Sequence, residues 1–83
     1  MKAYKLLRPA YGHSAGTIFV LDKKRSKPAI GLFLFTTTIK DPDIGLIPYS
    51  LCEFFITNSN DFAKIECTEM FARSILNDVE QWA

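Results

Sequence analysis

The chain has 83 residues, 48% of them apolar, with 10 Lys and Arg against 9 Asp and Glu, which leaves a formal charge of +1. This predicts one small globular domain over residues 1–83 and excludes disordered, fibrous and low-complexity classes. The longest apolar runs, at 17–21 and 29–35, are far shorter than the roughly 18 residues of a membrane-spanning helix. The N-terminus also lacks the regions of a signal peptide, so we expect a soluble cytoplasmic protein that does not bind a membrane.

Most of the first 66 residues predict β-structure. Five stretches are rich in β-branched, aromatic and other apolar residues and predict strands, namely 3–8, 17–22, 29–39, 44–47 and 62–66. Pro and Gly residues predict a loop at 9–16, and the polar stretch 23–28 predicts a second one. Residues 50–57 fit either a strand or a helical turn. Together these features predict a β-rich body over residues 2–66.

The last part of the chain predicts an amphipathic α-helix over residues 68–82. Its apolar residues recur at the three- and four-residue spacing of one helix face, namely Phe71, Ala72, Ile75, Leu76, Val79 and Trp82. Thr68 is placed to cap the N-terminus, and Glu69 and Arg73 are placed to form an i,i+4 ion pair.

Two of the predicted strands are apolar on both faces. Ile18 and Val20 point to one side of their strand, whereas Phe19 and Leu21 point to the other. Residues 30–35 repeat this pattern. Because both faces of such a strand must be covered, we predict that the C-terminal helix packs on one face and the core fills the other. A second copy of the chain is the alternative cover. The predicted fold class is therefore α+β, a small bent antiparallel sheet or SH3-like barrel of about five strands with one helix on it.

A family resemblance supports this architecture. The segments 2–9 and 15–22, which flank a Gly-rich loop, together with 47–49 and 62–66, resemble the small SH3-like barrel proteins that are common in tailed phages. The resemblance covers residues 2–66, and the C-terminal helix departs from it. It implies a viral accessory protein, an inhibitor or adaptor that docks on a host protein in the host cytoplasm. It assigns no functional residue.

Charge is distributed unevenly along the chain. Residues 1–40 carry eight Lys and Arg and one Asp, whereas residues 41–83 carry two Lys and Arg and eight Asp and Glu. This asymmetry is typical of a surface that faces a polyanion, unless the two halves intermix in the fold and cancel. The strongest cluster lies in the predicted loop 23–27, where four of five residues are basic. Such a loop suits phosphates or an acidic protein groove, or it is a solvated edge.

No motif in the sequence predicts catalysis, a metal or a cofactor. Residues 12–16 match G-x-S-x-G, but a strand and not a helix is predicted to follow, and His13 is the only histidine. We expect a flexible loop with a solvated His13. Residues 41–43 have two carboxylates around a proline and predict a turn. Cys52 and Cys67 have no metal-ligand spacing, so we expect buried thiols, with a disulfide as the alternative.

Two functions follow from these observations. The first is a non-enzymatic protein, monomer or homodimer, that docks on a partner protein with Tyr11 and Tyr49 as exposed anchors and Arg25 as a bidentate contact. The second is an RNA- or single-stranded-DNA-binding module built on loop 23–27, with Tyr4 and Tyr11 stacking on bases. We favour the first. The predicted binding residues are Lys5, Arg8, Tyr11, Lys23, Lys24, Arg25, Lys27 and Tyr49.

Overall fold

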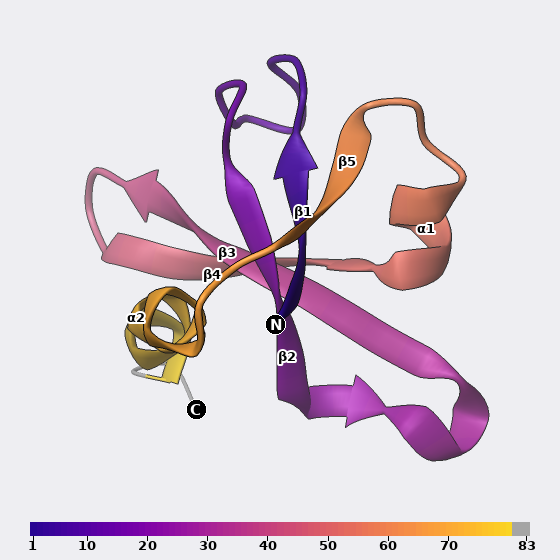
Figure 1. Ribbon diagram of the computed structural model, residues 1–83. Helices are drawn as coiled ribbons and strands as arrows, with labels where there is room; N and C mark the ends of the chain where they lie inside the picture. The colour runs from indigo at the N-terminus through magenta and orange to yellow at the C-terminus, as the bar shows by residue number, and fades with distance from the viewer. Residues whose placement is uncertain (81–83) are drawn as a thin grey trace.

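A computed structural model describes residues 1–80, which form one five-stranded antiparallel sheet with two α-helices (Figure 1). The strand order is β4-β3-β2-β1-β5. The elements are β1 (Lys2–Leu6), β2 (Ile18–Lys27), a 3-10 turn η1 (Pro28–Ile30), β3 (Leu32–Asp41), β4 (Gly45–Cys52), α1 (Glu53–Thr57), β5 (Phe62–Glu66) and α2 (Glu69–Glu80). The α+β class, the five antiparallel strands and the C-terminal helix are therefore confirmed. The sheet is open, with β4 and β5 at its edges, so a closed SH3-like barrel is not what the described residues form.

Several element boundaries differ from the sequence prediction. The basic stretch 23–27 is not a loop, because β2 continues to Lys27. The third strand begins at Leu32, after η1, and the fourth is longer than predicted, Gly45–Cys52. The ambiguous stretch 50–57 divides into the end of β4 and the short helix α1. The helix predicted over 68–82 is observed as Glu69–Glu80, and Trp82 lies outside the described residues.

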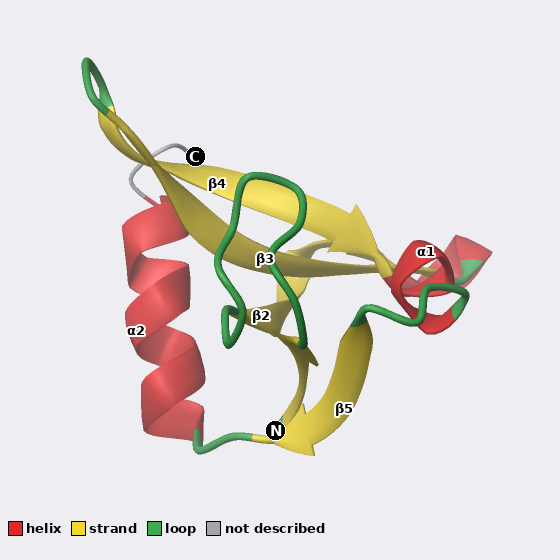
Figure 2. Cartoon of the chain, turned by 90° about the horizontal axis from the view of Figure 1, so that it is seen from above, coloured by secondary structure: helices red, strands yellow, loops and turns green. Residues whose placement is uncertain are grey.

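The sheet has apolar side chains on both faces, and each face belongs to a separate core. On one face Tyr4, Phe19, Phe35 and Ile56 are buried together, and Ile56 comes from α1. On the other face Ala3 and Val20 are buried against Ala72 of α2. Figure 2 shows α2 lying along one side of the sheet and α1 beyond the end of the long strands. The structure therefore confirms that the C-terminal helix covers the second face of the sheet.

The ends of α2 and the tight turns follow local rules. The Thr68 hydroxyl accepts a 3.1 Å hydrogen bond from the Phe71 N–H, and Arg73 pairs with Glu69 at 2.9 Å, as predicted. Asp41 closes the predicted turn by accepting bonds from the backbone N–H groups of Asp43 and Ile44. Both cysteines are free and half-buried, so the alternative of a disulfide is not formed. No helix within residues 1–80 is long and apolar enough to cross a membrane.

Candidate functional site

The basic segment of β2 is held in place by a buried aspartate. Four residues of β2, between Asp22 and Lys27, lie opposite the single residue Phe33 of β3, so β2 forms a large bulge here. Asp22 is only 4% exposed. Its carboxylate accepts hydrogen bonds from the Arg25 backbone N–H at 3.1 Å, and from the Arg25 guanidinium and the Thr36 hydroxyl at 3.3 Å each. Ser26 donates to the Asp22 carbonyl at 2.6 Å. The bulge is thus a fixed structure.

A groove of about 540 Å³ lies between this segment of β2 and the C-terminal half of α2. Four apolar side chains line it, which are Met1, Leu21, Leu76 and Val79. Lys23, Lys24 and Arg25 line it from the β2 side, and Glu80 lines it from α2. Its volume lies within the range of about 300–1,000 Å³ that is typical of ligand pockets. The residues of the predicted basic cluster therefore border an apolar groove.

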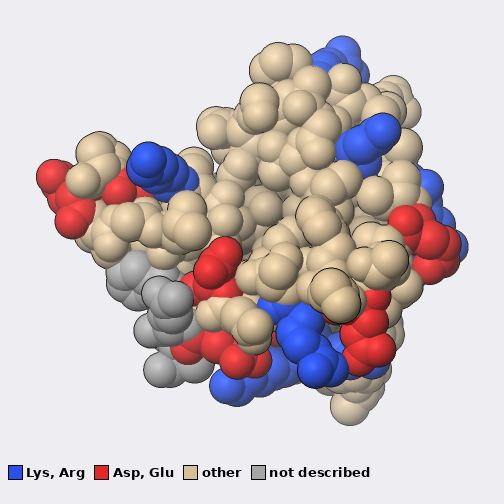
Figure 3. Space-filling model, turned by 60° about the vertical axis from the view of Figure 1, so that its left-hand side comes forward, with Lys and Arg blue, Asp and Glu red and all other residues tan. Residues whose placement is uncertain are grey.

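The three cations at this groove differ in their freedom to bind a partner. Arg25 is half-buried and its guanidinium pairs with Asp22, so the bidentate external contact predicted for it competes with an internal bond. Lys23 and Lys24 are exposed and form no ion pair with any residue in the range 1–80. Figure 3 shows Lys and Arg side chains gathered along the lower edge of the molecule beside Asp and Glu side chains. The two lysines are thus the available cations of the groove.

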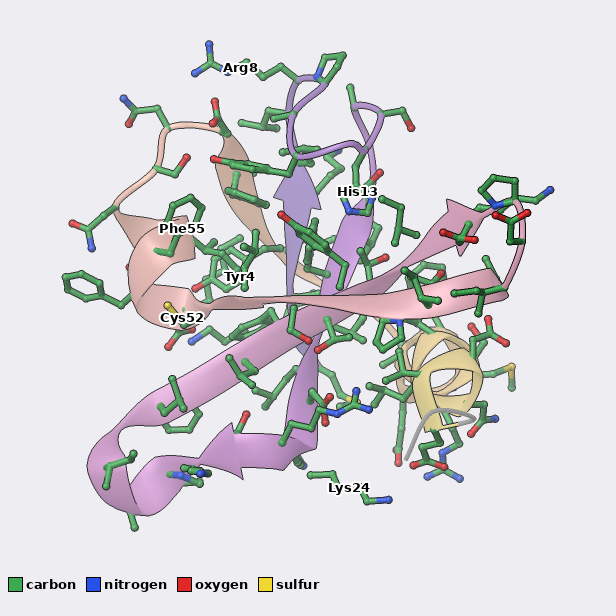
Figure 4. All side chains as sticks on the ribbon, turned by 180° about the vertical axis from the view of Figure 1, so that it is seen from behind. Tyr4, Arg8, His13, Lys24, Cys52 and Phe55 are labelled. Atoms are coloured by element: carbon green, nitrogen blue, oxygen red, sulfur yellow. The ribbon has the colours of Figure 1, made fainter. Side chains whose placement is uncertain are left out.

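The other cations predicted to bind a partner, which are Lys5, Arg8 and Lys27, do not line this groove, and Lys27 is the exposed last residue of β2. Figure 4 places Arg8 at the tip of a loop and Lys24 at the opposite end of the molecule. Arg8 pairs with Asp61, and this hydrogen-bonded contact holds the pKa of that carboxyl below its usual value. Lys5 is exposed on β1, between Ile18 and Ala63 in register. Lys2 and Arg8 are neutralised by ion pairs with Glu53 and Asp61 of the acidic half of the chain.

Tyr11 and Tyr49 are not the exposed anchors that the sequence predicts. Tyr11 is half-buried between Phe55 and Phe62, with ring centroids 5.6 and 6.1 Å away, and its hydroxyl donates to Asp61 at 3.3 Å. Tyr49 is also half-buried, and its ring lies 4.8 Å from that of His13. The error arises because a tyrosine has an apolar body that packs readily while its hydroxyl finds a partner. Both residues stabilise the aromatic core.

Tyr4 is buried as well, so it cannot stack on a nucleic-acid base. It is 6% exposed, and its hydroxyl donates a 3.0 Å hydrogen bond to Glu53, which also pairs with Lys2 at 2.5 Å. Burial raises the pKa of Tyr4. The bond to Lys2 lowers the pKa of Glu53, and the same bond raises the pKa of Lys2. In Figure 4, Tyr4 lies on the same side of the ribbon as Phe55 of α1.

His13 is half-buried, not solvated as expected from the sequence. Its ring packs edge-on against Phe19 at 5.6 Å and Tyr49 at 4.8 Å, and its Nε2 is buried without a hydrogen-bond partner among the described residues. This burial lowers the pKa of His13. A tight turn at Tyr11 and Gly12, both at positive φ, points the ring inward. A strand follows the G-x-S-x-G stretch, as predicted, so the geometry of a hydrolase elbow is not formed.

The sequence singled out Lys23 and Lys24 but missed the apolar half of the groove. Leu76 and Val79 belonged to the predicted helix stripe, which was expected to be used up in covering the sheet. In the structure Val79 is buried, whereas Leu76 stays half-buried and contributes to the groove. Within residues 1–80, no group of three or more His, Cys, Asp or Glu is placed to hold a metal ion.

Comparisons with known protein families, with curated proteins and with solved structures find no match to this chain. The function of the protein is therefore inferred from the geometry of the described residues.

Proposed function

We propose that this protein is a non-enzymatic binding domain that docks on another protein through the groove between β2 and α2. The observation that carries the proposal is the union of an apolar floor with two unpaired lysines at its border. Apolar pockets supply binding energy by excluding water, whereas neighbouring charges steer and orient the partner. The open sheet with α2 on one face acts as the scaffold that holds the two walls together.

The alternative of RNA or single-stranded DNA has less support from the geometry. Single-strand binders combine a basic track with exposed aromatic rings on which bases stack. Here Tyr4 is buried and Tyr11 is packed between two phenylalanines. Of the lysines that form no ion pair within residues 1–80, only Lys23 and Lys24 line the groove, and Glu80 lines its α2 side. The others lie apart on different strands, namely Lys5, Lys27, Lys40 and Lys64. A polyanion would therefore gain few contacts and meet a repelling carboxylate.

The nature of the partner is part of the proposal. The resemblance of residues 2–66 to phage accessory proteins suggests a host protein that the domain inhibits or bridges to another molecule. Such a role needs stoichiometric binding and no chemistry, which suits the apolar groove between β2 and α2.

A photo-crosslinking experiment tests this proposal. Benzoylphenylalanine is introduced at Asn77, an exposed residue of α2 beside the groove, and at Thr57, an exposed residue of α1. Each protein is irradiated in a nuclease-treated lysate of the cells in which it naturally occurs. We expect one protein to be crosslinked from position 77 and not from position 57.

Charge variants provide the matched controls for this experiment. Lys23→Glu with Lys24→Glu is expected to abolish the crosslink from position 77. Lys40→Glu with Lys64→Glu changes the net charge equally at exposed sites outside the groove and is expected to preserve it. Equal labelling from position 57, or no protein crosslink from position 77, would contradict the proposal. Circular dichroism shows whether both double variants keep the fold.

A further inference from the structure

The groove continues along α2 as a second hollow. This hollow has a volume of about 280 Å³ and shares Met1, Lys23, Leu76 and Glu80 with the first. Ala72, which lies one helical turn before Leu76, is the remaining apolar residue that lines this hollow. The two hollows together follow α2 from Glu69 to Glu80, a length of roughly 17 Å at about 1.5 Å per helical residue. The shape suits an elongated occupant better than a compact one.

The spacing of the two hollows matches an extended peptide. The floor of the first hollow is centred between Leu76 and Val79, and the floor of the second between Leu76 and Ala72. The centres of the two floors therefore lie about one helical turn apart, roughly 5.4 Å. In an extended chain, side chains on the same face recur every second residue, about 6.6 Å apart. A segment of about five residues spans the groove at roughly 3.3 Å per residue, and two of its side chains reach the two floors.

The charges along the groove are arranged asymmetrically. Lys23 and Lys24 stand on the β2 side without ion-pair partners in the described part of the chain. On the α2 side, Glu69 and Arg73 neutralise each other, and Glu80 remains as an acidic group. A carboxylate on the occupant is therefore attracted to the β2 side and repelled from the end of α2. This complementarity defines the chemistry of the occupant.

From this geometry we infer that the groove binds an extended acidic segment of a partner protein, in which one Asp or Glu lies between two large apolar residues. The apolar residues occupy the floors at Val79 and Ala72, and the carboxylate lies against Lys23 and Lys24. This inference rests on the proposed function, because it names the kind of protein surface that docks in the same groove.

Selection from a random library of displayed twelve-residue peptides tests this inference, with the full-length protein as the immobilised target. We expect enriched peptides to share the apolar–acidic–apolar pattern. A synthetic peptide of the enriched sequence is then compared with a version in which the acidic residue is replaced by its amide. We expect the amide version to bind at least tenfold more weakly in fluorescence anisotropy, because it loses its attraction to the two lysines.

The two double variants complete the design. Lys23→Glu with Lys24→Glu is expected to weaken the acidic peptide at least tenfold, whereas Lys40→Glu with Lys64→Glu leaves its affinity within twofold. Methyl resonances of Leu21, Leu76 and Val79 are expected to shift on binding. Failure to enrich any peptide, a basic or uncharged consensus, or equal binding by both double variants overturns the inference. If position 77 still crosslinks a protein in that case, the proposed function stands and only the acidic-segment inference fails.

Discussion

Phe19 and Val20 are neighbours on β2, neither has any exposed surface, and they belong to two different cores. Phe19 packs with the aromatic residues on one face of the sheet, whereas Val20 lies under Ala72 of α2 on the other. A strand of this kind cannot remain at a solvent-facing sheet surface. The position of α2, and therefore the groove beside it, follows from this pair of residues.

Shortening Val20 tests the contact between sheet and helix. Val20→Ala removes two buried methyl groups, so we expect the free energy of unfolding to fall by about 2 kcal/mol. Ile44→Ala, at a side chain that is 59% exposed, serves as the control and is expected to change it by less than about 0.5 kcal/mol. Urea denaturation measures both. Equal stability of the two variants would show that α2 does not cover Val20.

Removing the Asp22 carboxylate tests the bulge that presents the lysines. Asp22→Ala leaves the Thr36 hydroxyl and the Arg25 N–H without this acceptor. We expect a loss of about 2–3 kcal/mol in the free energy of unfolding, because unsatisfied buried polar groups are costly. Asp43→Ala, at an exposed turn position, is the control. Amide shifts confined to residues 22–27 and their β3 neighbours would accompany the loss, and an unchanged spectrum would refute this role.

The buried imidazole of His13 predicts a pH dependence of stability. Burial lowers its pKa in the folded protein below the ordinary value of 6.5, so the unfolded chain binds a proton more readily. Stability is therefore fully present above about pH 6.5 and declines as pH falls toward the folded pKa. His13→Phe removes this decline between pH 7 and 5.5, because no other histidine is present. Thermal unfolding at several pH values checks it, and parallel pH profiles would contradict it.

The ion pair between Lys2 and Glu53 predicts a second loss of stability, at a lower pH than the loss caused by His13. The bond to Lys2 lowers the pKa of Glu53 below the ordinary 4.5, so its stabilisation is present above that pH and is lost as pH falls through the folded pKa. Because solvent screens the half-exposed lysine, we expect Glu53→Gln to cost only about 0.5–1 kcal/mol at pH 7. The difference from wild type is expected to vanish by pH 3. A constant difference across this range, measured in urea, would exclude the ionic contribution.

Much of the fold could be predicted because its determinants are local. The unbroken apolar run around Phe19 predicted a strand with two buried faces, and the spacing of Ala72, Leu76 and Val79 predicted the helix that covers it. Thr68 and Asp41 were also placed correctly, since capping and turn chemistry depend on a few adjacent residues. Each of these features acts within about one turn or one strand of its own position.

The site was harder to predict because it depends on long-range contacts. The basic stretch after Asp22 reads as a loop, yet it is a bulged strand because Asp22 and Ser26 bond to Thr36 and Leu34 of β3. Tyr11 and Tyr49 read as exposed anchors, whereas rings from distant segments bury them. Nothing in the local sequence shows that Leu76 would be left half-buried to line a groove. Its neighbours are determined only when α2 packs against β2.

The contact between Val20 and Ala72 decides both the fold and the site most directly, because the groove exists only if α2 lies on β2. Nuclear Overhauser effects between the Val20 and Ala72 methyl groups measure it in solution. We predict a strong effect in a protein that sediments as a monomer. Absence of this effect, or its replacement by intermolecular effects at Val20 in a mixed-label dimer, would contradict both the fold and the proposed site.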